Sequence, residues 1–115
     1  MTEIAPEWVA ELKKGSVQML LLAILDEAPK YGFQIIRELR EATNGFFDLK
    51  EGTLYPALRR LEAKGYLEGR WNTETEGGPR KYYHMTDSGR KALKQAAKVW
   101  EDLVWSSKQV LKGTK

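Results

Sequence analysis

Two adjacent cations, Arg80 and Lys81, directly follow the sequence Gly77-Gly78-Pro79. Two flexible residues and one rigid residue beside two positive charges suit a protruding arm that places charge in a groove. Arg80 is the stronger candidate, because its planar guanidinium can bind a phosphate through two donors or enter a narrow minor groove. Lys81 acts more as a point charge. These residues indicate contact with a nucleic acid rather than a reaction.

A second group of polar side chains lies at the start of a helical segment that runs from Glu51 to Lys64. Lys50, Thr53 and Tyr55 can reach base edges and phosphates from there. Tyr55 can instead pack beneath the helix. Three cations follow on the same segment: Arg59, Arg60 and Lys64. These three can contact phosphates, or they can form an ordinary solvated face.

Catalytic and metal-binding side chains are scarce in this sequence. The chain has no cysteine and one histidine, His84. One imidazole cannot build a His-rich metal site, a Cys-type zinc site is excluded, and a Ser-His-Asp triad has only that ring available. We therefore expect no enzyme, no metal and no cofactor, and we expect His84 to be an ordinary strand residue.

The 115 residues are 42% hydrophobic and 30% charged and carry a formal net charge of +3. A chain of this length predicts one compact core. The charge is uneven, with −2 in residues 1–45, +2 in residues 46–91 and +3 in residues 92–115. A surplus this small is by itself a weak sign of nucleic-acid binding, because solvated helix faces often carry similar charge.

The pattern of apolar residues argues against a membrane protein. The longest apolar run, Met19–Leu25, is far shorter than the roughly 20 residues of a membrane span. The N-terminus has no basic region followed by an apolar stretch, which predicts no secretory signal and no membrane partner. The lack of cysteine agrees with a reducing compartment, so we expect a cytoplasmic protein.

Apolar spacing predicts three helices in the first part of the chain. The first runs from about Glu7 to Glu27 and is stopped by Pro29. The second has an apolar stripe around Ile35 and ends at Asn44-Gly45. The third runs from Glu51 to Lys64, where apolar and charged residues again alternate at helical spacing.

Pro56 constrains where the third helix starts. A proline inside a helix removes a backbone hydrogen bond and clashes with the preceding turn. If Thr53 is the N-cap, Pro56 falls within the first turn, where its missing N–H has no intrahelical partner to lose.

The rest of the chain predicts a hairpin followed by a long helix. Residues 66–71 and 80–85 are short, aromatic-rich segments on either side of a polar loop, a pattern typical of a β-hairpin. We expect Trp71 in the core of this hairpin. Thr86 begins a set of N-cap candidates for a helix that reaches about Lys112. Such a helix would be about 39 Å long, which is longer than a compact unit of this size covers.

Three helices, a hairpin and a long helix in this order describe a winged helix-turn-helix, mainly α with a minor β contribution from a two-stranded wing. In such domains the second helix of the pair enters the major groove and the hairpin reaches the phosphate backbone or the minor groove. We expect a DNA-binding domain at residues 1–86 and a C-terminal dimerisation helix at residues 87–115. We expect a dimer because the long last helix would extend past the body with its apolar stripe exposed. The same helix of a second copy, related by a twofold axis, is the simplest way to bury that stripe.

Four blocks of sequence carry a resemblance to a known family: KKGSVQMLLLAIL, YGFQIIREL, EGTLYPALRRLEAKGYL and GGPRKYYHMTDSGRKAL. Over about residues 13 to 93 they resemble, in order and spacing, the signature blocks of the PadR-like transcriptional regulators. The resemblance implies a bacterial or archaeal repressor that binds a two-fold DNA operator as a homodimer and is released by a small molecule. The positions that match family positions near DNA are Lys14-Gly15-Ser16, Tyr31-Gly32, Gly52-Thr53-Leu54-Tyr55 and Arg80-Lys81.

The C-terminal part resembles the short branch of this family, which has a single dimerisation helix. In one type within that branch, a Trp of each last helix lines a pore at the dimer interface and stacks on flat aromatic ligands. Trp100 matches that position, so it is a candidate for binding a small aromatic or hydrophobic effector, and Trp8 is a second candidate. Both side chains can instead be packing residues, as we expect for Trp105.

A winged-helix module that binds a protein and never DNA is the alternative function. Acidic or apolar residues at the start of the recognition helix and at the wing tip would favour it. The chain has Lys50, Thr53, Arg80 and Lys81 at these places, so DNA binding is the better prediction. Activation instead of repression stays open.

Overall fold

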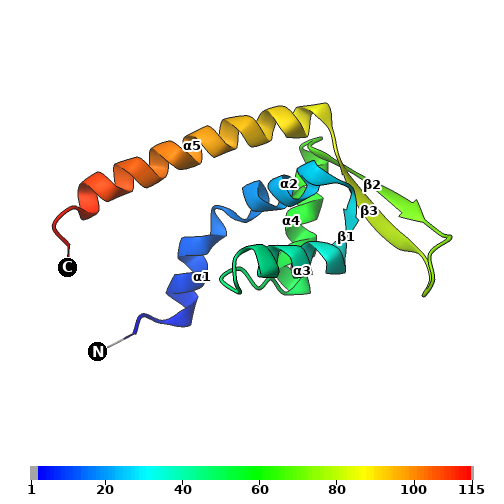
Figure 1. Ribbon diagram of the computed structural model, residues 1–115, viewed down its shortest axis with the longest axis horizontal. Coiled ribbons are helices and arrows are strands. Elements are labelled where there is room, and N and C mark those ends of the chain that lie inside the picture. Colours follow the sequence, from blue (N-terminus) through cyan, green and yellow to red (C-terminus); the bar gives the residue numbers. More distant parts are fainter. Residues whose placement is uncertain (1–2, 115) are drawn as a thin grey trace.

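The computed structural model describes residues 3–114, which form five helices and three strands (Figure 1). In chain order they are α1 (Pro6–Lys14), α2 (Val17–Glu27), β1 (Lys30–Tyr31), α3 (Gly32–Ala42), α4 (Glu51–Ala63), β2 (Leu67–Asn72), β3 (Arg80–Met85) and α5 (Asp87–Leu111). The helices α2, α3 and α4 form a body, the strands lie at one end of it, and α5 runs along one side and past it (Figure 1). The predicted fold class, a mainly helical winged helix-turn-helix, is confirmed.

Leucine and isoleucine side chains of α2, α3 and α4 form the core, since helical spacing places them on one face of each helix. Six side chains are less than 2% exposed: Leu21, Leu25, Ile35, Leu54, Leu58 and Leu61. Full burial of each such side chain contributes about 1.5–3 kcal/mol. The helix α2 contacts α3, α4 and α5, so the core fixes α4 relative to the rest of the body.

The predicted first helix is wrong as a single element, because the chain breaks between α1 and α2. The break falls at Gly15 and Ser16, where the Ser16 N–H and hydroxyl both donate to the carbonyl of Lys13, at 3.1 and 2.8 Å. Glycine is a weak helix former, and a serine hydroxyl competes for backbone carbonyls. As a result α1 leaves the body at an angle to α2 (Figure 1).

The helix α4 begins at Glu51, as predicted, but its N-cap is Lys50 and not Thr53, and Pro56 lies inside the helix. The Thr53 and Leu54 N–H groups already donate to the Lys50 carbonyl, at 3.0 and 2.9 Å. Glu51 in the first turn favours this earlier start, because a negative charge stabilises a helix N-terminus. Pro56 therefore costs the helix one internal hydrogen bond, which the burial of Leu54 and its neighbours offsets.

The predicted ends of α3 and α4 are confirmed. Asn44 and Gly45 follow α3 with φ values of 52° and 85°, and Gly65 follows α4 with a φ of 78°. These left-handed conformations close helices and are adopted readily by glycine and by asparagine. The chain therefore turns at the two places where the sequence predicted it.

The wing is the predicted hairpin with one additional short strand. The strands lie in the order β1-β3-β2, and both pairs are antiparallel. The β2–β3 register runs from Leu67 opposite Met85 to Asn72 opposite Arg80. The two-residue β1 pairs Tyr31 with Tyr82 and ties the start of α3 to the wing. Two residues are too few to show a period of two, so the sequence did not reveal this strand.

Trp71 does not lie in the core of the wing, contrary to expectation. Its side chain is 66% exposed, whereas Tyr83 on the facing strand is 5% exposed. The buried Tyr83 lies opposite Gly69, two residue pairs before the Trp71–Lys81 pair, so the hairpin extends past the side chains that would have buried Trp71.

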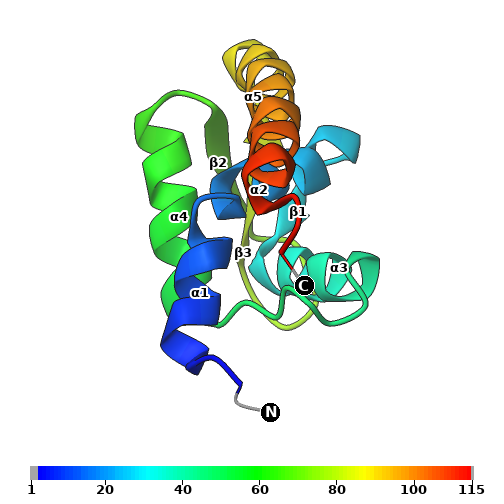
Figure 2. The ribbon, with the colours of Figure 1, turned by 90° about the vertical axis from the view of Figure 1, so that its left-hand side faces the viewer.

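The last helix extends well beyond the body (Figures 1 and 2). Thr86, the first of the predicted N-cap candidates, is its N-cap, and its hydroxyl accepts a hydrogen bond from the Gly89 N–H at 3.0 Å. The radius of gyration is 16.2 Å and the principal extents are 56 × 32 × 22 Å, whereas a compact chain of this length has a radius of about 13 Å. Large apolar side chains are exposed along its outer part: Val99, Trp100, Leu103, Trp105, Val110 and Leu111. Of the helices in residues 3–114, none combines the length and the apolar character that a membrane span requires.

Candidate nucleic-acid interface

The start of α4 presents a polar and accessible surface. Lys50, Gly52 and Thr53 are exposed there, and the start of α4 lies on the side of the molecule away from α5 (Figure 1). Leu54 was expected near DNA, but its side chain is 0% exposed. Leu54 therefore anchors the helix in the core, and its exposed neighbours form the outer surface.

Tyr55 packs between α4 and the start of α3. A Cβ atom placed on Gly32 would overlap the Tyr55 hydroxyl and come within 2.8 Å of its ring carbon Cζ. Gly32 is itself buried, and burial raises the pKa of Tyr55 above its ordinary value, with a further contribution from Glu51. Tyr55 therefore packs against the start of α3 while its side chain stays partly exposed, and Gly32 is the residue that makes room for it.

Arg80 is held against the start of α3 rather than at the end of a free arm. Its guanidinium carbon lies 4.5 Å from the centre of the Tyr31 ring, a distance typical of a cation–π contact. The Tyr31 ring in turn meets Tyr82 edge-on, with 5.5 Å between the centroids. The Tyr31 N–H is occupied by the side chain of Gln34 at 3.1 Å. The stack fixes Arg80 while its donors stay available.

Lys81 points to the other face of the wing, as strand alternation requires. Its Nζ lies 3.3 Å from the Glu62 carboxylate of α4 and 5.3 Å from the centre of the Tyr83 ring. A Cβ on Gly69 would lie 2.9 Å from the Glu62 carboxylate and would overlap the Lys81 side chain. Gly69 therefore leaves space for the Lys81–Glu62 ion pair, and the charge of Lys81 is partly neutralised within the protein.

The known proteins that this chain resembles share the same architecture. Residues 21–95 match the transcriptional regulator PadR-like family. The chain belongs to this family. A crystal structure of a PadR family transcriptional regulator from Eggerthella lenta superimposes with a TM-score of 0.82 at 33% identity, and the match covers 94% of this chain and 92% of that one. A transcriptional regulator from Mycobacterium tuberculosis is 31% identical over 103 residues, which are 90% of each protein.

The family assignment also settles the class of protein. The negative transcriptional regulator PadR of Bacillus subtilis is 27% identical over 73 residues, which are 64% of this chain and 40% of that protein. PadR-like proteins are transcriptional regulators, so this chain is a regulator and not an enzyme. In residues 3–114 no group of three or more His, Cys, Asp or Glu side chains is arranged to hold a metal ion.

The cations of α4 divide between two sides of the helix in this PadR-like regulator. Arg59 is exposed and shares the wing-facing side with Tyr55 and Glu62, since the three are spaced at helical intervals. Arg60 and Lys64 belong to the opposite side, and the Lys64 Nζ donates to Gln18 Oε1 at 2.8 Å. The sequence offered six cations of α4 and the wing as candidates for DNA contact but gave no sign of this division.

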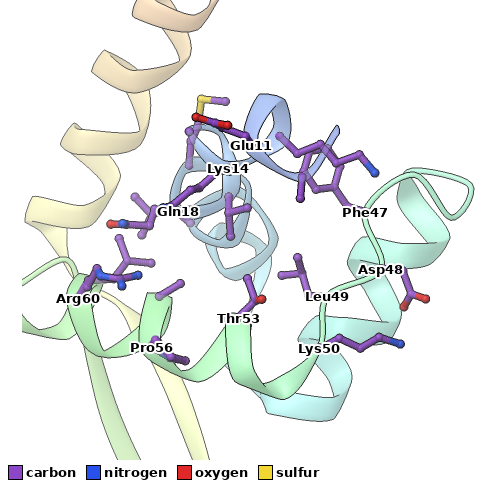
Figure 3. A pocket seen from close by; sticks show the side chains of 18 of the residues that line it. Glu11, Lys14, Gln18, Phe47, Asp48, Leu49, Lys50, Thr53, Pro56 and Arg60 are labelled. Atoms are coloured by element: carbon purple, nitrogen blue, oxygen red, sulfur yellow. The ribbon is translucent and has the colours of Figure 1, made fainter. Parts of the chain in front are cut away.

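A wide groove separates α1, α4 and α5, with a volume of about 1780 Å³. Figure 3 shows Lys14, Gln18, Thr53, Pro56 and Arg60 around it. Ser16, which was also expected near DNA, lies behind this surface and is only 3% exposed. Lys14 and Arg60 therefore lie at the groove, while Ser16 serves the break between α1 and α2.

A smaller apolar cavity of about 360 Å³ lies between α1, α2, the segment before α4 and α5. Trp100 lines it together with Leu12, Met19, Phe46 and Phe47. Trp8 is not among the residues that line this cavity or the wide groove, and its side chain is 54% exposed. Of the two tryptophans considered for an effector, Trp100 alone lines this apolar hollow.

Proposed function

We propose that this PadR-like regulator binds double-stranded DNA as a homodimer, with α4 in the major groove and the wing on the adjacent backbone. The observation that supports this most is the placement of exposed Lys50, Gly52 and Thr53 at the start of α4, on the same side of the molecule as the wing. Arg80, fixed by its stack on Tyr31, supplies a phosphate contact. Lys50, Thr53 and Arg59 supply contacts from α4.

The other candidate residues act around this surface. The contact between α3 and α4 is held by Gly32, Leu54 and Tyr55. Ser16 forms the hydrogen bond at the break before α2. Lys81 is paired with Glu62. Lys14, Arg60 and Lys64 lie toward the groove, where they reach DNA only along its edge. The domain division that follows is a DNA-binding part at residues 1–86 and a dimerisation helix at residues 87–115.

Dimerisation is supported by the exposed apolar surface of α5. Leu103 and Trp105 are 52% and 66% exposed, and α1 adds Trp8 and Leu12 at 54% and 64%. Two copies of this chain related by a twofold axis bury these side chains against each other. Sedimentation at micromolar concentration is expected to give a dimer for the wild-type chain. A Leu103→Glu variant should sediment as a monomer, and a monomeric wild type would refute the dimer.

We propose repression as the regulatory outcome, in accord with the similarity to the negative regulator PadR of Bacillus subtilis. A dimer reads a pseudo-palindromic operator because its two recognition helices enter successive major grooves about 34 Å apart. A small hydrophobic or aromatic effector bound beside Trp100 releases DNA if it favours a different separation of the two helices. Trp8 adds apolar surface near the same interface.

DNA binding is tested with a duplex from the region that flanks the gene of this chain. Fluorescence anisotropy at several salt concentrations should give a steep fall of affinity with salt for the wild type. Arg80→Ala should weaken binding and reduce the slope by about one phosphate contact per subunit. Thr73→Ala, which changes an exposed, uncharged residue of the wing loop, is the control. An unchanged slope in Arg80→Ala would exclude the phosphate contact.

The effector proposal has its own assay. Planar hydrophobic compounds should quench tryptophan fluorescence in the wild type and much less in Trp100→Ala. The same compounds should lower the affinity for DNA. A varied library of such compounds that leaves the fluorescence unchanged, or quenches Trp100→Ala equally, would rule out Trp100 as the binding residue.

A further inference from the structure

Trp71 lies on the face of the wing that is turned toward α4. Side chains alternate along a strand, so Trp71, Lys81 and Tyr83 share one face of the β2–β3 hairpin. Tyr83 is buried, and Lys81 reaches back over Gly69 to Glu62 of α4. Because Lys81 leans toward the base of the wing, its partner Trp71 is left uncovered at 66% exposure.

The side of α4 that faces the exposed ring carries an exposed cation, Arg59. Arg80 lies one residue pair beyond Trp71 along the hairpin, but its side chain is on the opposite face of the wing, against Tyr31. Tyr83 lies near enough to α4 that the charges of Glu62 and Arg59 act on its hydroxyl. Arg59 therefore supplies positive charge on the α4 side of the Trp71 face, and Arg80 supplies it from the other face of the wing.

The end of the wing, in contrast, is acidic. Glu74 and Glu76 lie in the loop after Asn72 and are exposed. Phosphates are repelled from this loop, so the wing is expected to meet a DNA backbone along its α4-facing side and not with its tip. That side is where the Trp71 ring projects.

We propose that Trp71 packs its ring against the deoxyribose sugars of the DNA backbone that passes between α4 and the wing. This inference rests on the proposed DNA-binding function. An indole has a broad apolar surface with one N–H donor, which suits a sugar flanked by phosphates. Contacts to sugar and phosphate position a protein on DNA without reading sequence. Trp71 therefore adds affinity for every duplex, whereas Arg59 and Arg80 supply the charge.

The test compares Trp71→Ala and Trp71→Phe with the wild-type chain in anisotropy titrations of the flanking duplex and of an unrelated duplex. Trp71→Ala should raise the Kd of both duplexes by a similar factor of about five or more, the lower end of what aromatic contacts to nucleic acid contribute. Trp71→Phe should keep most of the affinity. The salt slope should stay unchanged in both variants, in contrast to Arg80→Ala.

Tryptophan fluorescence gives a second readout that a purely structural role does not alter. Unlabelled duplex should quench the wild type, and the quenching should be lost in Trp71→Phe although this variant still binds. A Kd of Trp71→Ala within a factor of two of wild type, or full quenching in Trp71→Phe, would overturn the role of Trp71 while leaving DNA binding intact. A wild-type chain that binds neither duplex would overturn the DNA-binding proposal together with it. Equal melting temperatures of the three chains exclude misfolding as the cause.

Discussion

Replacing Gly89 with alanine tests how tightly the last helix is joined to the body. Gly89 lies in the first turn of α5 and is buried. A Cβ added there would overlap the carbonyl oxygen of Tyr66 and lie 2.7 Å from the Sδ atom of Met85. The Tyr66 carbonyl is backbone and already accepts the Thr86 N–H at 3.2 Å, so it cannot move aside without loss of that bond.

The size of the effect follows from these distances. Ordinary contact with the sulfur needs about 1 Å more space, and overpacking of this kind costs about 1–3 kcal/mol. Gly89 lies three residues, or about 4.5 Å, after the N-cap. If α5 pivots at Thr86 to gain 1 Å there, it tilts by about 13°, and its far end, about 37 Å away, moves by roughly 8 Å. The separation of two recognition helices in a dimer would change with it.

The matched control is Gly52→Ala in α4. An added Cβ at Gly52 meets no atom within 4 Å, and alanine is the better helix former by up to about 1 kcal/mol. Thermal melts should therefore show a lower melting temperature for Gly89→Ala and an equal or higher one for Gly52→Ala. A Gly89→Ala chain as stable as Gly52→Ala would refute the reasoning, since the two changes differ only in what surrounds the new methyl group.

Three further predictions concern the core, the wing and the response to pH. Leu58→Ala should lower the free energy of unfolding by about 3–5 kcal/mol in urea titrations, because Leu58 is 0% exposed. The control Arg60→Ala, at an exposed position, should change this free energy by less than about 0.5 kcal/mol. Equal losses of stability in the two variants would contradict the assignment of Leu58 to the core. Glu62→Gln frees Lys81 from its ion pair and should steepen the salt dependence of DNA binding by up to one contact per subunit; an unchanged slope would mean that Lys81 does not reach phosphate. Burial raises the pKa of Tyr83, so the unfolded chain loses this proton first. The stability that depends on it is complete below about pH 10 and is lost as the pH rises through the raised pKa. Melts from pH 9 to 11 should show a smaller alkaline decline for Tyr83→Phe than for wild type, and equal declines would exclude Tyr83 as its source.

Patterns that depend on local spacing were predictable from the sequence. The hairpin, the glycine-ended helices and the Thr86 N-cap each rest on a few neighbouring residues, and all are found. The continuous first helix failed because apolar periodicity passes through Gly15 and Ser16 without change, whereas the helix ends there through hydrogen bonds to Lys13. The start of α4 at Glu51 was predictable, but its N-cap is Lys50 and not Thr53, because the burial of Leu54 offsets the hydrogen bond that Pro56 removes inside the helix.

Contacts between distant segments were not predictable in this way. The stack of Arg80 on Tyr31 joins residues 49 positions apart, and the Lys81–Glu62 pair depends on the missing side chain of Gly69. The sequence favoured Arg80 over Lys81 for its planar guanidinium, but it did not show that the two side chains lie on opposite faces of the wing. Alternation along β3 separates them, so one faces α3 and the other faces α4, and only the first keeps its charge free of an ion pair.

Hydrogen bonds at the start of α5 connect this proposed dimerisation helix directly to the residues that follow α4, the proposed recognition helix. The Thr86 hydroxyl donates to the carbonyl of Gly65, at 2.7 Å, and the Thr86 N–H donates to that of Tyr66. Gly65 directly follows the end of α4, so the first turn of α5 is bonded to the residues that leave the recognition helix. Because β3 also runs straight into Thr86, a change in the angle between two α5 helices cannot be absorbed by a loose linker. It is expected to move α4 and the wing together, which is the motion that the proposed release from DNA requires.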